Sequence, residues 1–173
     1  MFWSRFWVRS VCVLLVLLLA PTSLGCGVRE KPTAHGLLLA MQETELPLPP
    51  GRSYLRAVPT EDPRYLSDAL ITALLGSGAY PPEMDGVCDV AWRISYTHPC
   101  ELAVFQCRDL RSADAVAKLC LRRLDALRQH LPEGEGEDGA YLSSARVTVR
   151  GVWVVLCVSS DPDAALRAFR RAL

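Results

Sequence analysis

A chain of 173 residues is long enough for one ordinary domain and too short for two. Half of its residues are hydrophobic, and its 19 basic and 19 acidic side chains balance. Without residues 1–25, which hold Arg5 and Arg9 but no acid, 17 basic and 19 acidic residues remain, a net charge of about −2. This balance excludes the basic face expected of a nucleic-acid-binding protein and leaves no positive patch for anionic lipids.

The N-terminal 25 residues have the order of a secretion signal. Arg5 and Arg9 form a positively charged region, and residues 11–20 (VCVLLVLLLA) are an unbroken apolar run of ten. A helix that spans a bilayer needs about 20 apolar residues, twice this length. We therefore expect a signal peptide over residues 1–25. The alternative is an uncleaved signal anchor that extends through Leu24.

The signal ends in the tetrapeptide Ser23-Leu24-Gly25-Cys26. It resembles a bacterial lipobox, in which the cysteine thiol takes a diacylglyceryl group and then becomes the first mature residue. Gly25 fits this motif, whereas Ser23 stands where leucine is usual, and both small residues equally suit ordinary signal peptidase. We predict a lipid anchor on Cys26 and a tether over residues 26–34; the alternative is a secreted soluble protein. Two or three acyl chains anchor stably, because each buried methylene adds about 0.8 kcal/mol.

Residues 35–173 are expected to form one domain. A short helix is predicted over residues 35–45 and a strand over residues 52–58. Between them, residues 46–51 (LPLPPG) are excluded from regular structure, because three prolines fix φ and remove hydrogen-bond donors.

A further helix is predicted between Asp62 and Gly76. Asp62 can cap it, Pro63 suits the first helical position, and Gly76 can close it in a left-handed conformation. The loop that follows, residues 77–86, is rich in Gly and Pro. The predicted apolar stripe of the helix consists of Leu66, Ala69, Leu70, Ala73 and Leu74.

The C-terminal half has the clearest periodicity. Residues 87–96 and 101–108 are predicted to be two strands joined by a short turn. In the second strand Ala103, Phe105 and Cys107 share one face, because side chains alternate along a strand.

A long amphipathic helix is predicted over residues 111–131, with Ser112 as its N-cap. A second hairpin turns at Gly151, and a last helix begins after Asp161 and Pro162. The strands of this hairpin span residues 145–150 and 152–159. The apolar set of the long helix is Ala113, Val116, Ala117, Cys120, Leu124, Leu127 and Leu131.

The order ββα-ββα implies an α+β two-layer sandwich, in which helices pack mainly on one face of an antiparallel sheet. Residues 152–158 (VWVVLCV) are apolar on both sides, so this strand should be central and covered on both faces. Residues 132–139 (PEGEGEDG) contain four acids but lack the spacing of a calcium loop, and they are predicted to be a solvated flexible loop.

Four segments carry a resemblance to a known family. They are ELAVFQC (101–107), LCLRRLD (119–125), VTVRG (147–151) and SDPDAALRAF (160–169). From about residue 50 to residue 173 the chain resembles the bacterial lipoproteins grouped as domain of unknown function 4358, found mostly in Gram-positive anaerobes. The resemblance implies a lipoprotein signal, and so favours a lipid on Cys26. It implies no activity, cofactor or site.

No catalytic motif is found along the chain. The sequence GSG at residues 76–78 lacks the third glycine of a dinucleotide fingerprint, and no zincin motif or nucleophile elbow occurs. The three histidines, His35, His98 and His130, fall on separate predicted elements, so no catalytic triad and no cofactor are expected.

The cysteines are unusual in number. Cys12 belongs to the signal and Cys26 to the anchor, which leaves five, so at least one stays free or pairs between chains. These five are Cys88, Cys100, Cys107, Cys120 and Cys157. No Cys-x-x-Cys motif occurs, and the spacing of Cys88, His98, Cys100 and Cys107 matches no zinc finger or ribbon.

Cys107 and Cys120 are expected to be neighbours, because both lie on apolar faces where the second strand of the first hairpin meets the long helix. The sequence leaves two interpretations open, a disulfide or two buried thiols in contact.

The sequence thus predicts a lipid-anchored protein on the extracytoplasmic face of a bacterial cell membrane. We expect a binding or envelope-support module whose partners are the membrane, through the N-terminal lipid, and an unidentified protein or small-molecule ligand. The alternative is a thiol-dependent enzyme at the cell surface that uses Cys100 or Cys88, the two cysteines nearest to loops.

Overall fold

The computed structural model describes residues 31–44, 48–130 and 137–173, of which Pro32–Leu173 belong to one compact unit. The predicted signal peptide and Cys26 therefore lie outside the described residues. The helices are α2 (Ala34–Gln42), α3 (Asp68–Leu75), the 3₁₀ helix η1 (Pro82–Gly86), α4 (Leu110–His130), α5 (Glu137–Ser144) and α6 (Pro162–Ala172). The strands are β1 (Gly51–Leu55), β2 (Val87–Ser95), β3 (Glu101–Cys107), β4 (Arg146–Arg150) and β5 (Trp153–Val158).

The five strands form one antiparallel sheet in the order β1-β2-β3-β5-β4. Both predicted hairpins, β2–β3 and β4–β5, are present, and the second turns at Gly151, whose φ of 58° favours glycine. The predicted α+β fold with an antiparallel sheet is confirmed. Strand β5 is buried along its whole length, as expected for a strand covered on both faces, although β3 rather than β5 is the middle strand.

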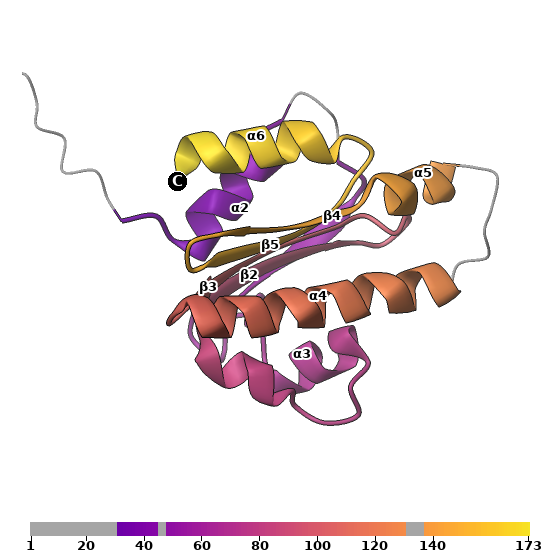
Figure 1. The fold of residues 1–173 in the computed structure, drawn as a ribbon. Coiled ribbons are helices and arrows are strands. Elements are labelled where there is room, and N and C mark those ends of the chain that lie inside the picture. Colours follow the sequence, from indigo (N-terminus) through magenta and orange to yellow (C-terminus); the bar gives the residue numbers. More distant parts are fainter. Residues whose placement is uncertain (1–30, 45–47, 131–136) are drawn as a thin grey trace, which may run out of the picture. The chain divides into compact units, whose positions relative to one another are not determined.

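The helices cover both faces of the sheet, which corrects the expectation that they pack mainly on one. Helices α2 and α6 lie on one side and α4 and α3 on the other (Figure 1). The physical reason lies in two of the three inner strands, because β3 and β5 carry apolar side chains on both faces and each face must be removed from water.

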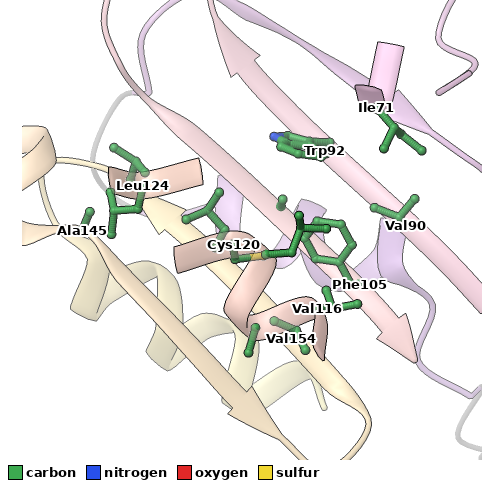
Figure 2. Close-up of a cluster of buried hydrophobic side chains, with 14 of the residues drawn as sticks. Ile71, Val90, Trp92, Phe105, Val116, Cys120, Leu124, Ala145 and Val154 are labelled. Carbon is green, nitrogen blue, oxygen red and sulfur yellow. The ribbon is translucent and has the colours of Figure 1, made fainter. Parts of the chain in front are cut away.

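The larger core lies between the sheet and α4. Phe105 is fully buried there, and its ring meets that of Trp92 edge to face at 5.5 Å between centroids. Figure 2 shows Cys120 and Leu124 of α4 in the same cluster. The predicted apolar face of β3 is confirmed, since Ala103, Phe105 and Cys107 all belong to this core.

Helix α3 begins later than predicted, at Asp68, and Ser67 is its N-cap. The Asp62 carboxylate instead accepts hydrogen bonds from the backbone and side chain of Arg64, and these bonds lower its pKa to about 2. Residues before the helix are held by the sheet, because Leu66 donates its backbone N–H to the carbonyl of Leu55. The predicted stripe is therefore wrong in part: Ala69 and Ala73 are exposed, Leu70 and Leu74 are half-buried, and Ile71 is the buried residue of α3.

Helix α4 matches its predicted range closely, but its cap differs. Asp109 accepts a hydrogen bond of 2.7 Å from the backbone N–H of Ser112, so Asp109 takes the capping role that was predicted for Ser112. The acidic segment is also partly corrected, because residues 137–139 begin helix α5. Helix α6 is confirmed, with Asp161 accepting from the backbone N–H of Ala164 at 2.9 Å.

Candidate functional site

A pocket of about 420 Å³ opens where β2 turns into β3, on the side of the sheet that α4 covers. Three parts of the chain line it: the β2–β3 turn, the C-terminal half of α4 and the first turn of α5. The hairpin contributes Ile94 to Glu101, α4 contributes Arg123, Leu127 and His130, and α5 contributes Asp138.

Glu101, the first residue of β3, supplies the most unusual group of the pocket, a carboxylate that is only 3% exposed. Its Oε1 accepts a hydrogen bond of 2.7 Å from Trp92 Nε1, across the β2–β3 hairpin. Its Oε2 accepts from Nε and Nη2 of Arg123 on α4, at 3.3 and 3.2 Å. One side chain in the lining of the pocket thus links two strands and a helix.

Burial raises the pKa of the Glu101 carboxyl above its ordinary value, and the bonds from Arg123 and Trp92 act in the opposite direction. The desolvation of a carboxylate with so little exposure outweighs the charge and the hydrogen bonds of Arg123 together with the bond from Trp92. The site therefore holds its proton more tightly than an exposed glutamate does.

His98 joins the β2–β3 turn to α5. Its Nδ1 lies 2.9 Å from Oδ1 of Asp138, and its ring stacks on Tyr141 with centroids 5.7 Å apart. The structure thereby brings His98 and His130 to one pocket, although the sequence placed them on separate elements. His35 lies apart from them on α2, the helix that packs on the other face of the sheet.

Burial raises the pKa of each of the four buried cysteines. Cys100 lines the pocket but is buried, and this burial raises the pKa of its thiol to about 11. Burial likewise raises the pKa of Cys107 to about 11 and that of Cys157 to about 12. Cys88 is exposed.

Cys107 and Cys120 are both buried in the core between the sheet and α4, and both are free thiols. Burial raises the pKa of Cys120, and the neighbouring Cys107 acts in the same direction. Which of the two interpretations left open by the sequence holds, a disulfide or two buried thiols in contact, stays a prediction. The four possible zinc ligands are not gathered together, and among the described residues no cluster of three or more such side chains is arranged to hold a metal ion.

Glu101 and Arg123 were missed at the level of sequence, yet a signal for them exists. Alternation along β3 puts Glu101 on the same face as the buried Ala103 and Phe105. On α4, Arg123 lies one turn after the buried Cys120, beside the apolar stripe. An acid and a base that both belong to buried faces indicate an internal ion pair.

Comparison of the chain with protein-family models, curated proteins and solved structures finds no match. The resemblance to lipoproteins of the domain of unknown function 4358 family accordingly remains a prediction from the four segments that carry it. None of the helices within residues 31–44, 48–130 and 137–173 combines the length and hydropathy of a membrane span.

Proposed function

We propose that this protein is a lipid-anchored extracytoplasmic binding module and that its ligand site is the pocket at the β2–β3 turn. The observation that carries the proposal is the Glu101–Arg123 pair in the lining of that pocket. Burying charged groups costs free energy that an apolar pair would not require, so an ion pair is weak evidence for stability alone. Its place in a concave site with convergent polar groups is typical of ligand binding.

The chemistry of the pocket favours a small polar ligand with an apolar part. Ile94, Pro99 and Leu127 supply apolar contact area, whereas Arg123 supplies hydrogen-bond donors. Among the contacts of the described residues, the bonds from Arg123 to Glu101 use only Nε and Nη2, which leaves Nη1 for a ligand.

The same observations weigh against the thiol-dependent enzyme. Cys100 is the cysteine of the pocket, and a thiol with a pKa of about 11 is ionised in only about one molecule in 10⁴ at pH 7. The thiolate is the nucleophile in such chemistry, so this cysteine is poorly suited to it.

The proposed binding is tested through Trp92, whose indole N–H contacts the pocket carboxylate. Trp153 lies in the core on the opposite face of the sheet, so a Trp153→Phe background leaves Trp92 as the reporter within the mature chain. A panel of small carboxylates, phosphates, amines and amino sugars is titrated while its fluorescence is followed. We expect saturable fluorescence changes with some members of the panel. Arg123→Lys should weaken the affinity for these compounds at least tenfold, and Leu121→Ala, on the exposed face of α4, should leave it unchanged. Equal responses in both variants, or none to any compound, would contradict the binding role.

The proposed anchor is tested separately by mass spectrometry of protein extracted from membranes. The expected N-terminal residue is Cys26, with a diacylglyceryl group on its sulfur. An intact Met1 terminus, or unlipidated protein released into the medium, would contradict the anchor without bearing on the pocket.

A further inference from the structure

The pairing of β2 with β3 contains a bulge beside a cysteine. Val87 on β2 lies opposite Cys107 on β3, but the next aligned pair joins Asp89 to Gln106. Cys88 is therefore the extra residue, and two residues of β2 oppose the single Cys107. A cysteine on one strand thus neighbours a cysteine on the adjoining strand.

The side chains of this region place both thiols on the α4 side of the sheet. Cys107 belongs to the core beneath α4, and Val87 packs against the same core. Asp89 faces the other way, because its carboxylate accepts a hydrogen bond from the backbone N–H of Ala34 in α2. Alternation between Asp89 and Cys88 puts Cys88 on the same side as Cys107, and the break in alternation falls at the bulge, between Val87 and Cys88.

The two thiols differ in access to solvent, because Cys88 is exposed and Cys107 is 3% exposed. They also interact electrostatically: after burial, the nearby Cys88 is the next cause of the raised pKa of Cys107. The pair thus combines one thiol that is open to reagents in solvent with a second that is almost fully shielded from them.

We propose that Cys88 and Cys107 form a disulfide across the β2–β3 bulge, by exchange that begins at Cys88. A disulfide requires Cα atoms about 4.4–6.8 Å apart, and neighbouring strands lie about 4.8 Å apart. The predicted partner Cys120 sits on a helix packed over the sheet, and the axis of such a helix lies roughly 10 Å from the sheet. Adjacent strands therefore favour Cys88 over Cys120 as the partner of Cys107.

The oxidant is a protein or small-molecule disulfide. The Cys88 thiolate attacks one sulfur of that disulfide, whose S–S bond breaks, so that a mixed disulfide forms and one thiolate leaves. Cys107 then gives its proton to solvent and attacks the sulfur of Cys88, and the second thiolate of the oxidant leaves. Two protein thiols are oxidised and one oxidant disulfide is reduced. Because burial raises the pKa of Cys107 to about 11, the second step should accelerate as pH rises.

Persistence of this bond in the cell rests on the export part of the proposed function, because disulfides are kept in oxidising compartments. The bond itself is tested on the purified full-length protein with oxidised glutathione, which makes no assumption about export. Proteolysis without reduction, by trypsin and a glutamate-specific protease, cuts after Arg93, Glu101 and Arg108. These cuts separate Cys88, Cys100 and Cys107 onto different peptides.

The wild-type protein should yield a linked Cys88–Cys107 peptide, and its formation should accelerate between pH 7 and pH 9. Cys107→Ala should stop at glutathione bound to Cys88, and Cys88→Ser should react with glutathione at least tenfold more slowly. Cys120→Ala is the matched control and should behave as wild type. A linked Cys107–Cys120 peptide, or wild-type protein that accumulates Cys88-bound glutathione as fully as Cys107→Ala does, would overturn the proposal.

Discussion

Two leucines on α4 allow the packing of that helix to be measured with one substitution at two sites. Leu124 is 3% exposed and lies in the core against the sheet, whereas Leu121 is 49% exposed on the outer side of the same helix. Leu→Ala changes intrinsic helix propensity by only a few tenths of a kcal/mol at either position. The difference between the two variants therefore reports burial alone.

Leu124→Ala removes contacts and leaves a cavity, so it should lower the free energy of unfolding by about 2–5 kcal/mol. Leu121→Ala loses only the contacts of a half-exposed side chain and should cost no more than about 1 kcal/mol. The assay is urea unfolding followed by tryptophan fluorescence. Equal m-values in wild type and variants would show that the substitutions change stability and not the surface exposed on unfolding. If the two variants unfold within about 0.5 kcal/mol of each other, the assignment of the buried face of α4 is wrong.

Four further substitutions test other parts of the fold. Phe105→Ala should cost about 3–5 kcal/mol in urea unfolding, because it empties a fully buried site and removes the edge-to-face contact with Trp92, and Phe105→Leu should cost less than half as much. Asp161→Ala should cost about 0.5–2 kcal/mol through loss of the α6 cap, whereas Asp161→Asn should restore most of it. Gly51→Ala should shift or abolish the β1–β2 pairing, seen as faster amide exchange in β1, because its Cβ would collide with the backbone carbonyl of Ile94. The pKa of Glu101 is raised in the folded state, so its contribution to stability is complete below its ordinary pKa of 4.5 and is lost as pH rises through the folded value. Over that interval the Tm of wild type should fall relative to the Tm of Glu101→Gln. Parallel curves of Tm against pH would contradict the buried carboxyl.

Local patterns were sufficient to predict most of the C-terminal half of the fold. The period of two in β3 and the period of 3.6 in α4 place Phe105 and Leu124 correctly in one core, because each pattern depends on near neighbours in the chain. The start of α3 was mispredicted for the opposite reason. Asp62 has the right chemistry for a cap, but Arg64 competes for its carboxylate and Leu55 holds Leu66 in extended pairing.

The candidate site was largely beyond local patterns. Glu101 and Arg123 are 22 positions apart and meet only because α4 packs across β3. His98 and Asp138 are 40 positions apart and require α5, a helix whose sequence carries little periodicity. The proposed Cys88–Cys107 disulfide depends on a one-residue bulge, which no alternation of apolar residues in β2 reveals.

The two edge strands of the sheet affect how copies of this protein interact when they are crowded at a surface. Strands β1 and β4 form its two edges, each five residues long, and open edges can add a strand from another molecule. Pro49 and Pro50 precede β1, and the exposed Arg146 and Arg150 lie at the two ends of β4. Short edges flanked by proline and like charges resist such addition. Under the proposed lipid anchor, copies held at one membrane would meet far more often than copies in solution, and these edges would keep such encounters from growing into sheets shared between molecules.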